Sequence, residues 1–279
     1  MNRPAKARLA NTADGPTACG GFGHVLRAEW TKLRTAGGTG RLLLLAVTLT
    51  VAVGSGTARA VKCPDVGCGQ DAVKLALTGV TVGQAVIAVF AVLAVSGEYG
   101  TGMIRTTLTA VPNRLTVLTA KAMVLTAAVL ASGTAAVLAS LLVGRHLLPG
   151  NGFTEAHGYV PLSLTDGPTL RAAVGSVLYL VLIALIGLGV ATAVREAATA
   201  IGLVLGLLYL FPVVTQVVND PEWQRHLQQI APMSAGLAIQ TTVNLPGMPV
   251  GPWEGLGVLA AWAATAMLSG ALVLRRRDA

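Results

Sequence analysis

Charged residues are scarce in this sequence. Only 11% of its 279 residues are Asp, Glu, Lys or Arg and only 4% are aromatic, whereas 53% are hydrophobic. A soluble domain usually has about 25% charged residues, so this chain lacks the side chains that a water-exposed surface of its size requires. The composition therefore excludes an ordinary soluble enzyme or binding domain and indicates an integral membrane protein.

Long uncharged runs account for most of the chain. A helix needs about 20 apolar residues to cross a hydrocarbon layer of about 30 Å, and backbone groups inside lipid must be satisfied within the segment. We therefore predict an all-α integral membrane fold. A cleaved signal peptide is the alternative for the first run, but the polar chain that precedes it favours a retained span. The predicted transmembrane domain covers 39–279, with spans at about 41–60, 74–96, 120–144, 171–194, 197–218 and 254–274.

Positive charge is distributed unevenly between the connecting segments. Of the 20 Lys and Arg residues, 14 fall in 1–41, in 97–121, in the turn at 195–196 or after the last span. Loops rich in Lys and Arg stay in the cytoplasm, so six spans predict that both termini are cytoplasmic (N-in/C-in) in a multi-pass protein of the plasma membrane. The net charge of +8 is then explained by the excess of Lys and Arg on the cytoplasmic side, where anionic lipid attracts basic residues. Because no basic patch is interleaved with aromatic residues, we predict no nucleic-acid partner.

The segment before the first span has two parts. Residues 1–20 are rich in Ala, Pro, Gly and Thr without hydrophobic periodicity, which predicts a disordered cytoplasmic tail. Residues 21–38 predict an amphipathic helix on the inner membrane surface. Trp30 and Leu33 fall on its apolar arc, and Arg34 lies off that arc.

Glu29 is the exception in this amphipathic pattern, because it falls inside the apolar arc. Two interpretations are open. Glu29 forms a local ion pair with Lys32, three residues further along the same helix face. Alternatively, it meets a cation from another segment, such as an arginine of 98–121.

Cysteine is also scarce. Of the three cysteines, Cys63 and Cys68 lie in the first outer loop and Cys19 lies in the N-terminal segment. Outside the membrane such a pair can oxidise to a disulfide that closes a small loop, and two free thiols are the alternative. Because no histidine is close in sequence, the pair predicts no metal site.

A charged strip, "EYGTGMIRTTLTAVPNRLTVLTAK" at 98–121, separates the second and third apolar runs. Thr101 is suited to cap a short helix that Pro112 ends, and Asn113 is suited to cap the third span. These capping and helix-ending residues predict a short cytoplasmic helix between two spans, and an ordinary surface loop is the alternative. "GTG" is not followed by GK[ST], so it predicts no phosphate-binding loop.

Groups that could power transport are absent from the six spans. Their centres contain no Asp, Glu, Lys, Arg or His, and the chain has no Walker A loop, nucleophile elbow or HExxH motif. We therefore predict that the chain is not an enzyme, carries no cofactor and depends on a partner for energy. The alternative is an ion-coupled secondary transporter or channel acting without an ATPase. Such a protein requires ionisable side chains inside the membrane, or broken helices whose backbone groups bind an ion.

Four segments resemble the ABC-2 type transporter permeases, particularly the actinobacterial ones. They occur in the expected order and relative to the expected spans. They are "AEWTKLRT" at 28–35, the strip at 98–121, "VREAATAIGLVLGLLYLFP" at 194–212 and "APMSAGLAIQ" at 231–240.

The resemblance implies a six-span half of an exporter. Such a subunit pairs with a second copy or a sister permease and with two copies of a separate ATPase subunit, which binds ATP and Mg²⁺. Apolar walls rich in small residues fit an amphiphilic or lipid-like cargo, such as a drug, antibiotic or lipid. By position, the resemblance assigns ATPase coupling to Glu98, Tyr99, Gly102, Arg105, Arg114 and Lys121, and the interfacial helix to Glu29, Trp30, Lys32, Leu33 and Arg34.

Overall fold

The computed structural model describes residues 18–35, 37–64, 68–100, 113–218 and 220–276. These residues are mostly helical and contain no β-strand. Six helical segments are long and apolar enough to cross a membrane, which makes this a multi-pass membrane protein and confirms the predicted number of spans. The segments are Thr39–Ala60, Ala72–Gly100, Arg114–Leu147, Gly167–Val194, Ala197–Val217 and Pro252–Arg276.

The α-helices keep the chain order of these spans, with short helices before and between them. Short 3-10 turns occur in the loops after α6 and α10. The α-helices are α1 (Ala18–Thr35), α2 (Thr39–Ala60), α3 (Ala72–Leu77), α4 (Val80–Gly100), α6 (Arg114–Leu147), α7 (Gly167–Val194), α8 (Ala197–Val217), α9 (Pro221–Ile230), α10 (Pro232–Leu237) and α11 (Pro252–Arg276).

Two helices continue past the ends of the predicted spans. The second span is divided into α3 and α4, and α4 continues to Gly100 instead of ending at residue 96. The third span begins at Arg114 instead of residue 120. Asn113 caps it as predicted, since its side chain accepts a hydrogen bond from the backbone N–H of Leu115 at 3.2 Å. Both helices extend because their terminal charged residues are paired with other parts of the protein.

The N-terminal helix also differs from its predicted bounds. Helix α1 begins at Ala18, inside the predicted tail, and ends at Thr35 instead of residue 38. It ends earlier because Gly37 and Gly38 lower the helical propensity of the residues that follow. Residues 1–17, which make up the rest of the predicted tail, lie outside the described residues.

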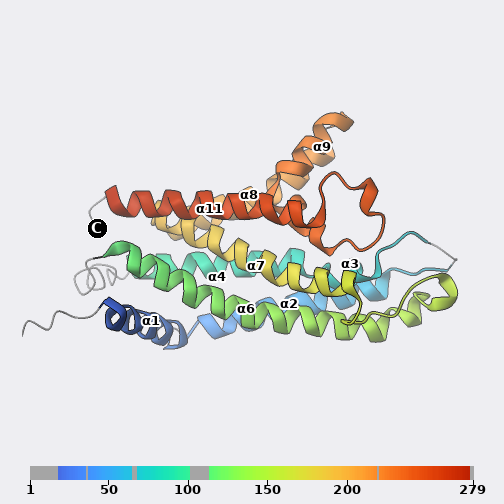
Figure 1. Cartoon of the computed structure of the whole chain (residues 1–279), viewed down its shortest axis with the longest axis horizontal. Coiled ribbons are helices and arrows are strands. Elements are labelled where there is room, and N and C mark those ends of the chain that lie inside the picture. Colours follow the sequence, from blue (N-terminus) through green and yellow to red (C-terminus); the bar gives the residue numbers. More distant parts are fainter. Residues whose placement is uncertain (1–17, 36, 65–67, 101–112, 219, 277–279) are drawn as a thin grey trace, which may run out of the picture.

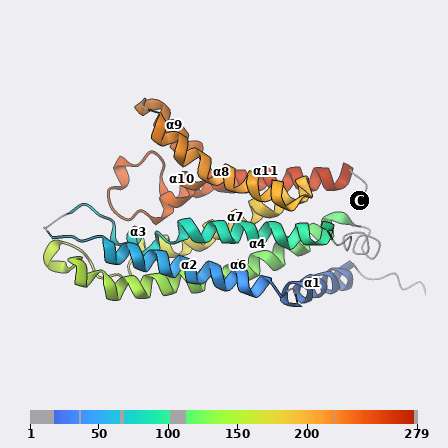
Figure 2. The same cartoon turned by 180° about the vertical axis from the view of Figure 1, so that it is seen from behind.

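The spans lie side by side along the long axis of the molecule, with α7 at the centre (Figures 1 and 2). Helix α7 packs against α4, α6, α8 and α11 and is the most deeply buried span, whereas α8 is the least buried. Small residues allow this packing. A Cβ atom at Gly189 would lie 2.3 Å from the carbonyl carbon of Ala266, so only glycine permits this approach of α7 to α11.

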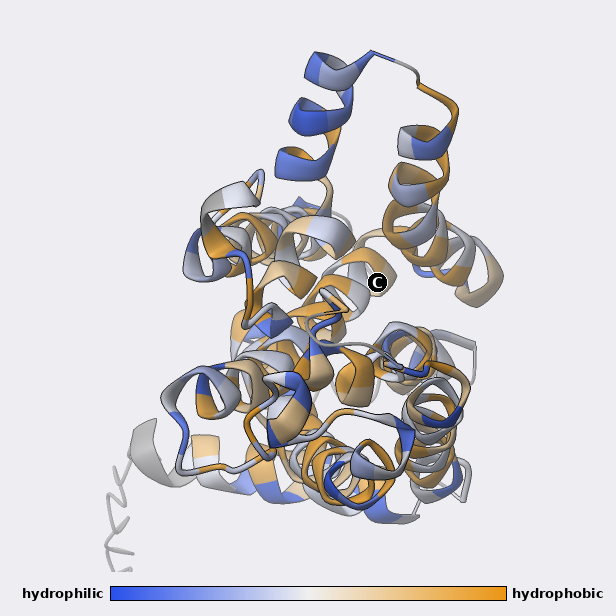
Figure 3. Ribbon diagram, turned by 90° about the vertical axis from the view of Figure 1, so that its right-hand side faces the viewer, coloured by the Kyte–Doolittle hydropathy of each residue, from blue (hydrophilic) through white to orange (hydrophobic). Residues whose placement is uncertain are grey.

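The two ends of the bundle differ in the elements that they gather. At one end, termed the α1 end, lie α1, the end of α4, the start of α6 and the last residues of α11 (Figure 1). The two-residue connection at 195–196 makes α7 and α8 an antiparallel hairpin, as predicted. The opposite end, termed the α9 end, contains α3, α10 and the long loops. Helix α9 leans away from the bundle there (Figures 1 and 2), and its residues are mainly hydrophilic (Figure 3).

Candidate functional site

Four charged side chains from three helices meet at the α1 end. This charge cluster consists of Glu29 and Lys32 of α1, Glu98 of α4 and Lys121 of α6. The Nζ atom of Lys121 lies 2.7 Å from Oε2 of Glu29 and 2.8 Å from Oε1 of Glu98. The Nζ atom of Lys32 lies 2.7 Å from Oε1 of Glu29 and 3.2 Å from Oε1 of Glu98. The charges alternate, and each carboxylate contacts both ammonium groups.

The charge cluster is mostly buried. Glu29 is 4% exposed, Glu98 and Lys121 are each 8% exposed, and only the Lys32 side chain, at 31%, has substantial contact with the surface. Removing a charge from water costs several kcal/mol unless it is paired in good geometry. Separating α1 from the bundle would therefore break the ion pairs that offset the cost of burying these charges. The cluster holds α1 against α4 and α6.

Local sequence explains how the four side chains meet. On α1, Glu29 follows buried Val25 by one turn, so this face of the helix points to the bundle and packs against α6. Glu98 belongs to the last turn of α4, and Lys121 lies two turns into α6. Glu98 lies in the part of α4 beyond the predicted second span, whereas Lys121 lies at the start of the predicted third span.

The α1 members of the cluster have shifted pKa values. Burial acts to raise the pKa of Glu29, but Lys121 and Lys32 outweigh it and hold this pKa below the usual 4.5. Burial acts to lower the pKa of Lys32, but Glu29 and Glu98 outweigh it and hold this pKa above the usual 10.5. Both groups therefore stay charged over the whole physiological range.

Both interpretations of Glu29 are realised in the structure. It pairs with Lys32 in its own helix and also with a cation from another segment. That cation is Lys121, not an arginine of the strip. Glu29 thus accepts one hydrogen bond from Lys32 in its own helix and one from Lys121 in α6.

The other predicted coupling residues lie outside the charge cluster. The guanidinium carbon of Arg195 lies 5.4 Å from the ring centre of Tyr99, within the range of a cation–π contact. Nη1 of Arg114 donates to the carbonyl oxygen of Leu274 at 2.8 Å, which joins α6 to α11. Gly102 and Arg105 lie outside the described residues. Sequence reasoning missed the role of Arg195, although its place in the short turn between two spans was a usable signal.

The predicted residues of the N-terminal helix occupy different faces of α1. Trp30 is 43% exposed and Arg34 is also exposed, so neither contributes to the charge cluster. Leu33 is partly buried beside it. The apolar arc is therefore divided, with one part packed against the bundle and Trp30 at its exposed edge.

A cavity of about 460 Å³ adjoins the charge cluster, and we term it the charged cavity. The four cluster residues line one part of it. Apolar side chains of α2, α4 and α6, including Leu42, Phe90, Leu93 and Val124, line the remainder. These residues were not predicted, because a cavity among four helices has no periodicity in any one of them.

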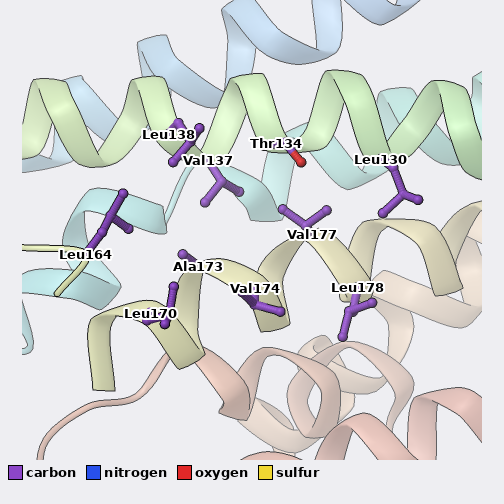
Figure 4. Close-up of a pocket in the computed structure, with 10 residues that line it drawn as sticks. All are labelled: Leu130, Thr134, Val137, Leu138, Leu164, Leu170, Ala173, Val174, Val177 and Leu178. Carbon is purple, nitrogen blue, oxygen red and sulfur yellow. The ribbon is translucent and has the colours of Figure 1, made fainter. Parts of the chain in front are cut away.

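A second cavity, of about 250 Å³, lies between α6 and α7 (Figure 4). In Figure 4, Leu130 and Val137 of α6 point toward α7, and Val177 of α7 points toward α6. The hydroxyl of Thr134 is the only polar side-chain atom in its lining. This apolar groove has no group that would orient a polar ligand.

Hydrogen bonds to backbone groups organise the α9 end. The carboxylate of Asp71 accepts from the backbone N–H of Lys74, from the backbone and hydroxyl of Thr242, and from the N–H of Val243. Cys63 and Cys68 are joined as a disulfide. Asp71 therefore ties the start of α3 to the loop that follows α10.

The strongest polar groups inside the spans bond to one another. Tyr179 donates to Gln84, which donates to the Thr81 carbonyl at 3.1 Å, and Tyr209 donates to the same carbonyl. Buried polar groups that are satisfied in this way stabilise packing. Within the described ranges, no group of three or more His, Cys, Asp or Glu side chains is placed to hold a metal ion.

Comparison with protein-family models and with curated proteins finds no match for this chain. The side chains and helices described above are therefore the basis for assigning a function. Among them, the charge cluster is the feature that most requires explanation, because buried charge is costly and this cluster involves three separate helices.

Proposed function

We propose that this chain is the transmembrane permease subunit of an ABC-2 type, ATP-driven exporter. The charge cluster is the observation that carries this proposal. It ties α1 to α4 and α6, the two helices that flank residues 101–112. A force applied to α1 or to this connection is thereby transmitted to two spans. The resemblance of 28–35 and 98–121 to the family's signatures supports the same assignment.

The proposed orientation places the α1 end in the cytoplasm of a plasma-membrane protein. Arg27, Arg34, Arg114, Arg195 and Arg275 belong to this end, and Lys and Arg accumulate on the cytoplasmic side of membrane proteins. Both termini then face the compartment that contains ATP. A soluble ATPase subunit reaches α1 and the α4–α6 connection from that side.

In the proposed mechanism, the ATPase supplies the energy and the charge cluster transmits the motion. Two ATPase copies close on ATP and Mg²⁺, which displaces α1 and the α4–α6 connection. Because Lys32 and Lys121 each contact both carboxylates, small displacements of α1 exchange ion pairs without leaving a buried charge unpaired. The chain forms half of the pathway, and a second copy or a sister permease forms the other half. The sparsely covered helix α8 offers one surface for that partner.

An ion-coupled secondary transporter or channel is the alternative function. It needs a titratable or ion-coordinating site inside the membrane. The centres of the spans contain no ionisable Asp, Glu, Lys, Arg or His, and the polar groups Gln84, Tyr179 and Tyr209 are engaged in hydrogen bonds within the bundle. These observations favour a partner-driven permease with an amphiphilic or lipid-like cargo.

Reconstitution tests the proposed function. The purified chain is incorporated into liposomes alone or with an ABC ATPase subunit encoded beside it, and accumulation of the amphiphilic drug doxorubicin is measured. We expect accumulation only when both the ATPase and ATP are present. Accumulation by the chain alone, driven by a sodium or proton gradient, would support the alternative and contradict the proposal.

A further inference from the structure

A third cavity, of about 430 Å³, lies at the α9 end, and we term it the loop cavity. Its walls come from α3, α9, α10 and the loop between α10 and α11, elements that lie together at this end (Figure 2). Its volume falls within the range of about 300–1,000 Å³ that is usual for small-molecule sites. It shares no lining residue with the charged cavity or with the α6–α7 groove.

The polar side chains that line the loop cavity can all donate hydrogen bonds. They are Lys74 of α3, Gln228 of α9, Ser234 of α10, and Thr241 and Asn244 of the loop. None of the described residues that line this cavity is Asp or Glu. Within the described part of the chain, the side chains of Lys74, Gln228 and Asn244 form no hydrogen bond or ion pair with another residue. These three side chains are therefore available to a ligand that carries anionic oxygens.

Two hydroxyl groups in the wall of the loop cavity are buried without a partner. Thr241 is 8% exposed, and neither its hydroxyl nor that of Ser234 has a hydrogen-bond partner within the described residues. A buried polar group that stays unsatisfied costs about 1–3 kcal/mol, and such groups in folded proteins are usually satisfied. The loop cavity adjoins both residues, so a ligand or a water molecule held there can supply the missing partner.

The fold fixes the walls of the loop cavity. Asp71 ties α3 to the loop residues Thr242 and Val243, and Nη2 of Arg171 donates to the carbonyl oxygen of Thr241 at 2.6 Å. Each oxygen of the Asp71 carboxylate already accepts two hydrogen bonds, so this carboxylate is not an open acceptor for a ligand. Donors that are held in place before a ligand arrives lower the entropy cost of binding.

Apolar side chains complete the lining and favour an amphiphile. Leu237, Val243, Met248 and Val250 belong to this part of the wall, and Val243 is 46% exposed, so the apolar wall continues onto the surface. The cavity also lies where spans begin, because α3 opens the second span and α11 begins directly after the loop. The ends of spans lie at the depth of the lipid headgroups. A phospholipid presents a charged phosphate next to apolar chains at this depth.

We propose that the loop cavity binds the phosphate group of an anionic phospholipid of the phosphatidylglycerol class. The Lys74 ammonium and the side-chain amides of Gln228 and Asn244 donate to the phosphate oxygens, and the apolar part of the lipid lies against Val243. A zwitterionic phospholipid also carries an ammonium group, for which the described lining offers no carboxylate. This inference concerns the chain alone and does not depend on the ATPase partner.

Native mass spectrometry of the full-length chain in detergent tests the site. The protein is titrated with phosphatidylglycerol or phosphatidylethanolamine of the same chain length, with and without inorganic phosphate, and the lipid-bound fraction is measured. Lys74→Gln removes the charged contact, and Val243→Trp fills the cavity from its exposed edge. Lys62→Gln and Val160→Trp are the matched controls, because both residues are exposed at the same end and lie outside the lining.

We expect phosphatidylglycerol to bind at least about 10-fold more tightly than phosphatidylethanolamine. Lys74→Gln and Val243→Trp should each weaken its binding by about 10-fold, the equivalent of about 1.4 kcal/mol, whereas both control variants should bind as the wild type does. Equal binding of the two lipids would overturn the anionic assignment. Undiminished binding by Lys74→Gln would overturn the location, even if Val243→Trp fails to fold. Displacement of the lipid by an equal concentration of inorganic phosphate would show a site for a soluble anion and overturn the phospholipid assignment.

Discussion

The two ends of this bundle are held together by different kinds of interaction. At the α1 end, side chains of Glu29, Lys32, Glu98 and Lys121 pair with one another across three helices. At the α9 end, Asp71 pairs mainly with backbone N–H groups, and a disulfide closes the neighbouring loop. The first end also encloses a cavity of about 460 Å³ next to its charges.

This difference separates a part of the molecule that can rearrange from a part that is fixed. Flexible side chains with two partners each can exchange those partners when a helix shifts. A carboxylate bound to several backbone N–H groups specifies one arrangement of the chain, and close backbone contacts such as that of Gly79 with Thr50 add to this constraint. We therefore expect motion to begin at the α1 end, while the α9 end keeps its structure.

Lys121→Met should produce the largest effect, because it removes a buried ion-pair partner from both Glu29 and Glu98. Removing one partner of a buried ion pair typically costs about 3–5 kcal/mol. The measurement is the midpoint of thermal unfolding of the purified protein in detergent. Arg27→Met on the exposed face of α1 is the matched control, with an expected change within about 0.5 kcal/mol. Equal midpoints for Lys121→Met and the wild type would contradict the structural importance of the cluster.

Acidification should weaken the same cluster less severely, since a protonated carboxyl still forms a hydrogen bond. The pKa of Glu29 is lowered from 4.5 on folding, so its contribution to stability is present above 4.5 and is lost as the pH falls through the folded-state pKa. The pKa of Lys32 is raised above 10.5, so its contribution is lost only at more alkaline pH. Unfolding midpoints across the acid range should fall more for the wild type than for Glu29→Gln. Identical pH profiles would contradict this assignment.

Asp71→Asn should destabilise the α9 end by about 1–3 kcal/mol, because the amide replaces a carboxylate that accepts hydrogen bonds from buried donors. Hydrogen exchange should increase at Thr242 and Val243 and stay unchanged in α1. The exposed residue Glu155 supplies a matched control, Glu155→Gln, with no expected change in exchange. Increased exchange in α1 would show that the two ends are not independent.

Reduction of the Cys63–Cys68 disulfide should have a smaller effect than Lys121→Met. The cross-link spans five positions in sequence, and the chain-entropy estimate for so short a loop is about 2 kcal/mol. Unfolding midpoints with and without reductant measure the effect, and Cys68→Ser should abolish the difference. A loss of stability on reduction that is larger than the loss caused by Lys121→Met would show that the disulfide stabilises the protein more than the charge cluster does.

Hydropathy predicted the spans because the bilayer imposes a length and an apolar composition on each one separately. The predicted spans stop short of the end of α4 at Gly100 and of the start of α6 at Arg114, because Glu98 and Lys121 look like loop residues when considered alone. Their burial depends on each other and on Glu29, so no local pattern reveals it. Even so, a carboxylate in the apolar arc of α1 correctly indicated that Glu29 requires a partner.

Other features depend on contacts between distant segments. Asp71 looks like an ordinary loop residue, and its bonds to Thr242 and Val243 join parts of the chain about 170 positions apart. The charged cavity likewise depends on how α2 and α4 diverge from their contact at Gly79. Such divergence is a property of packed helices and leaves no periodicity in the sequence.

The most direct test of the account uses the double variant Glu29→Gln/Lys121→Met in the complex with the ATPase. This change removes the α1–α6 ion pair and keeps the opposite charges of Lys32 and Glu98, whose Nζ and Oε1 atoms lie 3.2 Å apart in the wild type. ATP-dependent doxorubicin accumulation is measured in liposomes after assembly of the complex has been verified. We expect an assembled complex that hydrolyses ATP but no longer accumulates the drug. Accumulation at the wild-type rate would contradict the claim that the charge cluster transmits the work of the ATPase to the spans.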